Sequence, residues 1–334
     1  MVNAVQFRGS ENGIVRETKV LPAIKDEEVL IRVTHSGLCG SDILALQQPM
    51  VLGHEGIGII EAIGSAVTLF KTGERVGWGG INKTCGICEF CHSGRDAYCP
   101  DIGLYFITDQ ENGGSICSHA IRDHRWIFHI PDTLASEDAA PLMCGGATVW
   151  APLIEHCKPY DRVGIVGMGG LGHMAIQYAK KMGCDVVVFS STNDKRQEAL
   201  DLGATEFYAT KGVADFSTLG MKPVNRLLIS SSTKTDLAIF YPILSHSATI
   251  IVLSVNEGDI TVPHTPTVIL GHKVVGSLVC NHFLQEKAID FAARNDIHVT
   301  VEKFPMTLEG VKACANKLAS GKMRYRGVLA WEYS

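Results

Sequence analysis

The sequence predicts an α/β protein with two domains, in which a β-rich domain is combined with a doubly wound parallel sheet. The chain has 334 residues, which is enough for two domains of ordinary size. Up to about residue 140, short apolar runs are separated by glycines, whereas apolar strands alternate with helical patterns after Cys144. A glycine-rich turn lies between the first of these later strands and its helix.

The β-rich part contains runs with strand-like composition. Residues 29–33 read VLIRV and residues 56–63 read GIGIIEAI, and residues that favour turns bound both runs. This pattern is typical of a compact, barrel-like β domain.

The doubly wound part is expected to begin with a helix over residues 147–157. Its predicted strands and helices follow in order: strand 162–166, helix 173–182, strand 185–190, helix 193–202, and strands 226–229, 249–253 and 274–279. Strands that alternate with helices need crossover connections, so the sheet is expected to be parallel. Beyond Asn281 we expect a helix (284–294), an extended segment (298–306), another helix (308–319) and a strand (327–331).

Four cysteines lie within the run CGICEFCHSGRDAYC, with the spacing C-x2-C-x2-C-x7-C: Cys85, Cys88, Cys91 and Cys99. Short loops bring such thiolates together around zinc, and a set of four leaves no position open for a substrate. The run therefore predicts a structural zinc site. The alternatives, buried core cysteines or two disulfides, fit this spacing less well in a reducing compartment.

The glycine turn has the pattern G-x-G-x-x-G, formed by Gly167, Gly169 and Gly172, with Gly170 and Leu171 between them. The first glycine permits a tight turn, the second lets the backbone approach a pyrophosphate, and the third allows close packing of helix on strand. Because the pattern follows a strand and opens a helix, it predicts a dinucleotide site.

The end of the second strand predicts NADP(H) as the dinucleotide. An NAD enzyme usually has an acidic residue there to bind the ribose. This chain instead has hydroxyl side chains followed by basic residues, which suit a 2'-phosphate: Ser190, Ser191, Thr192, Lys195 and Arg196. Asp194 could serve the ribose hydroxyls, but it falls in the loop beyond the strand.

A second cluster is spread along the chain. Cys39 lies in GLCGSD, His54 and Glu55 lie in GHEGIG, and Cys144 lies near the expected domain junction. Two cysteines and a histidine with a neighbouring carboxylate can hold a zinc that keeps one position for water or substrate. With these motifs in this order, the sequence resembles the zinc-dependent medium-chain alcohol dehydrogenases over essentially its whole length. The segments GMGGLGHMAIQYAK, VVVFSS and RYR are most similar to the cinnamyl alcohol dehydrogenase branch.

The resemblance implies that Cys39, His54 and Cys144 bind a catalytic zinc, which makes two zinc ions per chain, and that Glu55 can join or leave that metal. It implies that Ser41 hydrogen-bonds the substrate oxygen and passes its proton. Asp42 would orient the ligands, paired with Arg324.

The resemblance also implies the domain limits. A GroES-like catalytic domain would comprise residues 1–144 and 283–334, with a structural-zinc lobe over residues 79–100. A Rossmann NADP-binding domain would comprise residues 145–282. In this family the last strand of the nucleotide sheet, here about 273–279, pairs with its two-fold mate, so we expect a homodimer.

Two departures from the family bear on the substrate. Leu44 stands where many relatives have a histidine that conducts the proton to solvent, and the segment between Asp42 and Gly53 is short. Both fit reduction of a bulky or aromatic aldehyde, and both leave open an enal (C=C) or iminium (C=N) reductase. A non-catalytic, quinone-oxidoreductase-like binding protein is a third alternative. The expected pocket lining is Leu44, Met50, Trp78, Tyr105, Phe106 and Asn281.

Composition excludes several other classes. Hydrophobic residues make up 46% and charged residues 19%, as in globular proteins, and the formal net charge of -5 argues against a nucleic-acid partner. No apolar stretch of membrane-spanning length and no signal-peptide core is apparent. Eleven cysteines without a secretory signal favour a reducing, cytoplasmic location.

Overall fold

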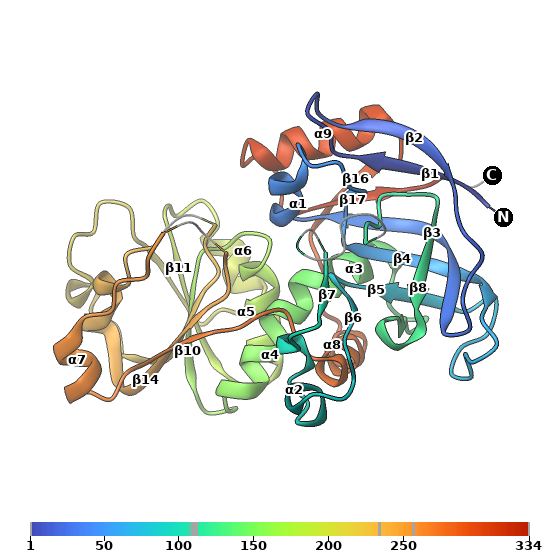
Figure 1. The fold of residues 1–334 in the computed structure, drawn as a ribbon. Coiled ribbons are helices and arrows are strands. Elements are labelled where there is room, and N and C mark those ends of the chain that lie inside the picture. Colours follow the sequence, from blue (N-terminus) through green and yellow to red (C-terminus); the bar gives the residue numbers. More distant parts are fainter. Residues whose placement is uncertain (1, 106, 108–112, 233–234, 256–257, 333–334) are drawn as a thin grey trace. The chain divides into compact units, whose positions relative to one another are not determined.

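The chain folds into two units, which the computed structural model describes over residues 2–105, 107, 113–232, 235–255 and 258–332 (Figure 1). Unit 1 comprises Met1–Ala147 and Asn281–Ser334, and unit 2 comprises Thr148–Cys280. Among the described residues, no helix is long and apolar enough to cross a membrane.

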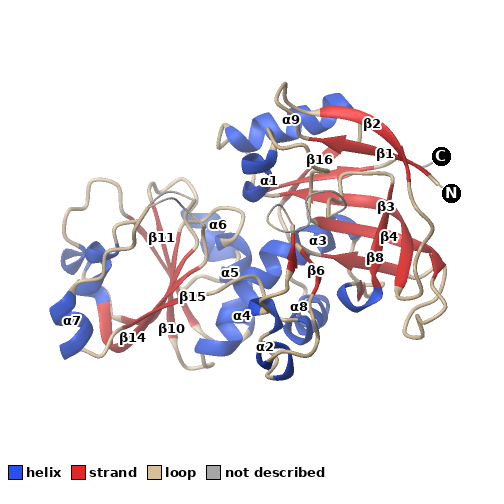
Figure 2. Cartoon of the chain, in the orientation of Figure 1, coloured by secondary structure: helices blue, strands red, loops and turns tan. Residues whose placement is uncertain are grey.

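Unit 1 is built around a seven-stranded sheet, drawn in red in Figure 2. The order is β16 (Val301–Pro305), β17 (Arg326–Ala330), β3 (Glu28–Leu38), β4 (Glu55–Ile63), β5 (Arg75–Trp78) and β9 (Phe128–His129), and β8 (His119–Asp123) also pairs with β3. Burial alternates along most of β3, as expected for a strand with one face in the core. The C-terminal strand β17 runs antiparallel to β3, with Gly327 opposite Leu38, so residues from both ends of the chain meet at the end of β3.

Two strand pairs and several short helices complete unit 1. The pairs are β1 (Asn3–Arg8) with β2 (Val15–Val20), and β6 (Ile81–Lys83) with β7 (Gly103–Leu104). The helices are α1 (Gly40–Ala45), α2 (Glu89–His92), α3 (Ser136–Pro141), α8 (His282–Asn295) and α9 (Leu308–Ala319). There are also 3₁₀ turns η1 (Asp96–Tyr98) and η2 (His124–Trp126), and a π-helical turn η3 (Leu142–Gly146).

Unit 2 is a parallel sheet of six strands in the order β12-β11-β10-β13-β14-β15. Their bounds are β10 (Arg162–Val166), β11 (Asp185–Ser190), β12 (Glu206–Ala209), β13 (Val224–Ile229), β14 (Leu244–Val252) and β15 (Lys273–Gly276). Numbered along the chain this order is 3-2-1-4-5-6, that of a dinucleotide-binding doubly wound sheet. The connections contain α4 (Ala147–His156), α5 (Gly172–Lys181), α6 (Arg196–Asp201), η4 (Phe216–Leu219), η5 (Leu237–Ile243) and α7 (His264–Ile269).

The predicted fold class is confirmed, and β10 and β11 have the predicted bounds. Both strands are buried along nearly their whole length, which is why they read as continuous apolar runs. Several other bounds were wrong, among them the end of β15 at Gly276 rather than residue 279, and two of these differences have a clear cause. Helix α6 begins at Arg196 rather than at residue 193, because the Arg196 amide closes a turn onto the Asn193 carbonyl. Strand β14 begins at Leu244, before a polar stretch in which Ser247 has a positive φ that interrupts the apolar pattern.

Candidate active site

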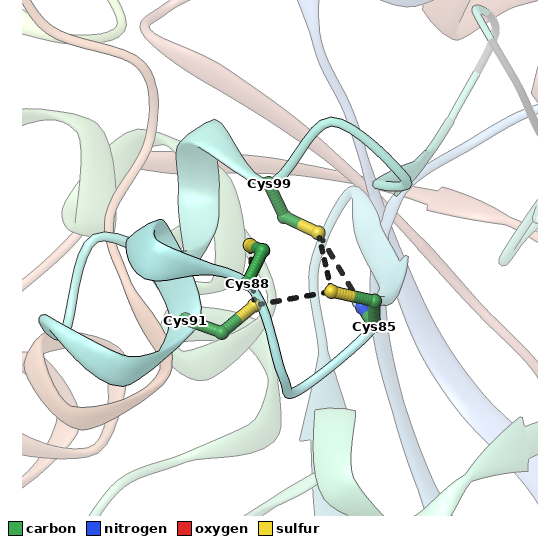
Figure 3. Close-up of side chains that lie close together, drawn as sticks. All are labelled: Cys85, Cys88, Cys91 and Cys99. Carbon is green, nitrogen blue, oxygen red and sulfur yellow. Dashed lines mark hydrogen bonds between the residues drawn. The ribbon is translucent and has the colours of Figure 1, made fainter.

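The four cysteines of the C-x2-C-x2-C-x7-C run point toward one another in a lobe between β6 and β7 (Figure 3). The Sγ–Sγ distances are 3.5 Å for Cys88–Cys91, 3.6 Å for Cys85–Cys99 and 4.0 Å for Cys85–Cys91. None of the four is in a disulfide. A hydrogen bond from the Ile87 amide lowers the pKa of Cys85 to about 7, whereas burial raises the pKa of Cys91 to about 12, so in the metal-free cluster the thiolate is favoured at Cys85. The donor set and its compactness fit a structural zinc ion.

A second group of possible metal ligands comes together where β3, β4 and η3 meet in unit 1. Cys39 follows β3, His54 and Glu55 lie at the start of β4, and Cys144 lies in η3. One ligand atom from each lies within 4.8 Å of the others. His54 Nε2 lies 3.2 Å from Cys144 Sγ. The Cys144 thiol holds the pKa of Cys39 well below its usual range, so one thiolate is already favoured at this site.

Asp42 fixes the geometry of this group from α1. Its carboxylate is fully buried and accepts from the Cys39 amide at 2.7 Å, the Gly53 amide at 3.0 Å and His54 Nδ1 at 3.2 Å. With Nδ1–H donating to Asp42, the Nε2 of His54 is left to face the cysteines. This carboxylate–histidine arrangement is the one that orients histidine ligands in metal sites.

Glu55 contributes a carboxylate with one satisfied and one unsatisfied oxygen. Its Oε1 pairs with Arg326, whereas its buried Oε2 has no hydrogen-bond partner among the described residues. Burial raises the pKa of Glu55 to about 7, although the charge of Arg326 opposes this shift. A Cβ on Gly37 would lie 1.9 Å from Oε2, so only glycine leaves room for this carboxylate. A buried oxygen without a partner is costly, and a metal ion would satisfy it. The four residues therefore fit a zinc site.

Cys144 is presented by the π-helical turn η3. The Ala147 amide donates to the Leu142 carbonyl, five residues earlier, which widens the helix at this point. Such π turns are frequent at functional sites. No pattern in the sequence indicated this turn, since the apolar spacing continues through it into α4.

The glycine turn in unit 2 has the geometry expected of a dinucleotide site. Gly167 has a φ of +91°, and a Cβ on Gly172 would lie 1.9 Å from the Gly167 carbonyl oxygen. A Cβ on Gly169 would meet no atom within 4 Å, so the backbone there is open to a ligand. Gly170 and Leu171 complete the turn before α5 begins at Gly172. These positions fit the three roles predicted for the glycines.

The residues expected to select the cofactor lie where β11 ends. Ser190 is the last residue of β11, and Ser191 and Thr192 follow it. Lys195 extends to the glycine turn, where its Nζ donates to the Met168 carbonyl at 2.8 Å. Thr192 donates to Asp194 at 2.9 Å.

Arg196 is occupied elsewhere in unit 2. It donates to the Phe207 carbonyl at 2.8 Å and lies over the Phe207 ring at 5.3 Å. Of the two basic residues considered from the sequence, Lys195 is therefore the one near the glycine turn.

One prediction about the surroundings of Cys39, His54, Glu55 and Cys144 is wrong. Asp42 orients Cys39 and His54 as expected, but the arginine that reaches this group is Arg326 rather than Arg324, and it pairs with Glu55. Only Arg326 lies in β17, whose register beside β3 carries it to Cys39 and Glu55. The motif RYR thus contained the signal, but the choice between its two arginines depends on a strand register that the sequence does not specify.

The expected pocket lining is wrong for three of its six residues. Met50, Trp78 and Tyr105 have no exposed surface and belong to the core of unit 1. Asn281 caps α8, where its side chain accepts from the Leu284 amide at 2.7 Å. Leu44 is 66% exposed, and Phe106 lies outside the described residues.

Comparison with known proteins agrees with this geometry. Residues 25–132 match the family model of the alcohol dehydrogenase GroES-like domain, and residues 170–294 match that of the zinc-binding dehydrogenases. Cinnamyl alcohol dehydrogenase 8 of Arabidopsis thaliana is 30% identical over 318 residues, which cover 91% of this chain and 88% of the plant protein.

Solved structures give the same relationship. A cinnamyl alcohol dehydrogenase of Sorghum bicolor superimposes with a TM-score of 0.90 at 26% identity, covering 98% of this chain and 97% of that one. The cinnamyl alcohol dehydrogenase of Helicobacter pylori, determined in complex with NADP(H), has a TM-score of 0.88 at 25% identity and covers 98% of both chains. The matches span both units, so this chain belongs to the zinc-dependent medium-chain alcohol dehydrogenases, in their cinnamyl alcohol dehydrogenase-like branch.

Proposed function

We propose that this alcohol dehydrogenase family member is a zinc-dependent, NADPH-linked reductase that interconverts a bulky or aromatic aldehyde and its primary alcohol. The observation that carries the proposal is the convergence of Cys39, His54 and Cys144 around the unsatisfied oxygen of Glu55. A purely structural site would not need a carboxylate that remains unsatisfied beside the three other donors.

In this proposal Cys39, His54 and Cys144 hold the catalytic zinc. When bound there, zinc supplies a Lewis acid that polarises the carbonyl or lowers the pKa of the alcohol. Asp42 keeps His54 in the tautomer that presents Nε2, and Arg326 balances the charge that Glu55 brings into a buried site. These residues act before any substrate arrives, because they preorganise the charges of the site.

Ser41 is the proposed proton donor to the substrate. It is the second residue of α1, and its Oγ lies 3.9 Å from Cys39 Sγ, at the edge of the ligand group. Leu44, one turn further along, cannot carry a proton onward. We therefore propose that water takes the proton from Ser41, which the exposure of Leu44 supports.

NADP(H) carries the hydride. In this chain the proposal rests on three features: the glycine turn, the hydroxyl side chains of Ser190, Ser191 and Thr192, and the ammonium of Lys195 beside that turn. No acidic residue ends β11, the position at which an NAD enzyme usually has one.

A substrate panel tests this function. The purified protein is incubated with NADPH and with aromatic aldehydes, short aldehydes, enals and cyclic imines, and the products are identified. We expect the highest kcat/KM for aromatic aldehydes, with the alcohol as product. Saturated aldehydes formed from enals, with no alcohol, would contradict the proposal.

A C=C or C=N reductase is the second candidate, and Leu44 is the observation that favours it. Delivery of hydride to an activated C=C or C=N bond needs no serine-to-histidine relay, so loss of that relay would cost such an enzyme nothing. The Ser41→Ala variant separates the two: carbonyl reduction should fall, whereas C=C or C=N reduction should persist. A non-catalytic binding protein would retain NADPH and reduce nothing in the panel.

We also propose that the protein is a homodimer in a reducing compartment such as the cytoplasm. Strand β15 is an edge strand of its sheet, and apolar side chains are exposed in α7 and the segment before it: Ile260, Val262, Val268 and Ile269. Pairing β15 with its two-fold mate would cover them. Light scattering at micromolar concentration should give twice the mass of one chain, and a monomer mass would contradict the proposal.

A further inference from the structure

The structural-zinc lobe is closed at its base by β6 and β7, where Ile81 pairs with Leu104. Tyr105 follows β7 directly, and its amide donates to the Gly80 carbonyl at 2.7 Å. The position of Tyr105 is thus set by the same short strand pair that carries Cys85 on one side and Cys99 on the other. Any change in the lobe that moves β7 also moves this tyrosine.

Tyr105 lies against a ligand of the other metal site. Its ring stacks on the His54 imidazole with centroids 4.8 Å apart and an angle of 29° between the planes. Both side chains are buried. The tyrosine therefore limits rotation of the imidazole from one face.

A second connection runs from the lobe to α8. The Asn281 side chain donates to the Gly94 carbonyl at 2.8 Å, and the Asp96 carboxylate accepts from the His282 amide at 3.2 Å. Gly94 and Asp96 both lie between Cys91 and Cys99. The His282 ring also packs beside Trp126 and Phe128, which fixes the first turn of α8. The lobe thus helps to determine where α8 begins.

One turn into α8, Gln285 contacts the turn that presents Cys144. Its Nε2 donates to the Leu142 carbonyl at 3.4 Å, and its side chain is buried. Leu142 is the first residue of the π-helical turn η3, and its carbonyl also accepts from the Ala147 amide. A displacement of α8 would therefore act on the turn that aims the Cys144 sulfur.

We propose that the structural-zinc lobe positions two ligands of the catalytic metal, with Tyr105 as the positioning residue for His54 and Gln285 as the positioning residue for Cys144. The inference rests on the proposed catalytic zinc site. It gives the four-cysteine site a role beyond stability, because the two metal sites communicate through side chains of unit 1. Partners of metal ligands typically change metal affinity by about 10–100-fold when they are removed.

The test follows release of the catalytic metal. Wild-type protein loaded with two zinc ions is mixed with a chromogenic chelator, and the release phase that disappears in Cys39→Ser is assigned to the catalytic site. We expect Tyr105→Leu to release this zinc about tenfold faster or more, and to shift the d–d absorption of cobalt(II) placed there. Tyr105→Phe, which keeps the ring, should show a smaller change. The matched control is Tyr178→Leu, a buried tyrosine packed beside Trp150 in unit 2, which should release zinc as the wild type does.

Two further variants test the connection through α8. Gln285→Leu should also accelerate release, whereas Asn295→Ala, which removes a side-chain bond to the Phe291 carbonyl at the other end of α8, should not. Asp96→Ala should give a smaller change in the same direction, and Asp215→Ala, which removes a comparable cap from η4, should give none.

Release rates within twofold of the controls in both Tyr105→Leu and Gln285→Leu would overturn the inference. If Tyr105→Leu does not fold, Gln285→Leu decides between the two results. If the wild type and Cys39→Ser release zinc with the same phases, the catalytic-metal assignment is overturned, and the inference with it.

Discussion

Around Cys39, His54, Glu55 and Cys144, some side chains would bind a metal and others hold these ligands in place. Asp42 is the clearest member of the second kind, since its buried carboxylate accepts from two amides and one imidazole. Arg326 and Glu55 form a buried ion pair, and such pairs are costly to break because the remaining charge is left uncompensated. Asp42 and Arg326, which are not in the group of possible ligands, thus help to hold its geometry.

The first prediction concerns the catalytic metal. Cys39→Ser should leave a folded protein that binds NADPH and one zinc per chain, because Cys39 contributes nothing to the glycine turn or the four-cysteine lobe. Aldehyde reduction should fall about 100-fold or more, since a Lewis acid contributes several kcal/mol. Metal analysis and kcat/KM measure both effects. Cys117→Ser, another buried cysteine of unit 1, is the control, and unimpaired reduction by a Cys39→Ser/His54→Ala protein would contradict the assignment.

The second prediction concerns the cofactor. Lys195→Ala should lower kcat/KM for NADPH about tenfold or more with little effect on NADH, because a charge contact to a phosphate is worth about 1.5–3 kcal/mol. Arg196→Ala should keep the preference, since that guanidinium is bound to the Phe207 carbonyl and ring. Equal kcat/KM values for the two cofactors in the wild type would rule out the NADP assignment.

The sequence predicted the four-cysteine group and the glycines because the types and spacing of these residues are chemical requirements. The group of Cys39, His54, Glu55 and Cys144, which the structure brings together, was predicted from the resemblance to the family and not from spacing. The sequence did not predict Arg326, whose partner Glu55 lies far away in the chain and is reached only through the register of β17 on β3. It also placed Tyr105 in a pocket, because an aromatic residue near a site can either line a cavity or pack beneath a ligand. The choice between these depends on tertiary packing.

At the scale of elements, the lobe between β6 and β7 has short helices that bury few side chains. Its helix α2 has four residues and no buried side chain, and η1 has three residues. Such limited apolar burial does not offset the conformational entropy that the segment loses when it is ordered. Metal binding supplies the remaining folding free energy.

The third prediction follows from that imbalance. Cys91→Ser should lose one zinc per chain and lower the Tm, by about 2–4 °C for each 1 kcal/mol lost in a domain of this size. Cys184→Ser removes a buried thiol from unit 2 and should keep both zinc ions. The check is zinc content together with thermal unfolding. A Cys91→Ser protein with two tightly bound zinc ions would show that this cysteine is not a ligand.

The bounds of strands could be predicted from the sequence where the strand is uniformly buried, but not where polar residues lie within the strand. The interiors of β10 and β11 are apolar and buried, and the bounds of both strands agree with the sequence pattern. In β14 the residues Ser245, His246 and Ser247 conceal the start of the strand, and the π-helical form of η3 left no mark in the sequence. Sheet pairing and packing decide these details.

At the scale of the whole molecule, each unit has cores of its own. One cluster in unit 2 lies between the sheet and η5, and two separate clusters fill unit 1. Both proposed zinc sites belong to unit 1, whereas the glycine turn belongs to unit 2. Zinc should therefore stabilise unit 1, whereas the dinucleotide should stabilise unit 2.

The fourth prediction uses this separation. In calorimetry, NADPH at about 100 times its Kd should stabilise unit 2 by about 2.7 kcal/mol, and a zinc chelator should destabilise unit 1. Two transitions that respond separately are expected, with NADH as the weaker ligand for comparison. A single transition that both reagents shift equally would show that the units unfold as one.

The position of β17 has a further consequence, for the order of events during synthesis. The strands of unit 2 are all translated before β17, so that sheet can fold while the ribosome is still adding residues. The sheet of unit 1 must wait, because β17 lies between β16 and β3, and Arg326 reaches Glu55 only from that strand. Until residue 326 has left the exit tunnel, the thiols of Cys39 and Cys144 remain in an incomplete site. A nascent chain that is stalled before this point would fold its nucleotide unit but would not complete the proposed catalytic site.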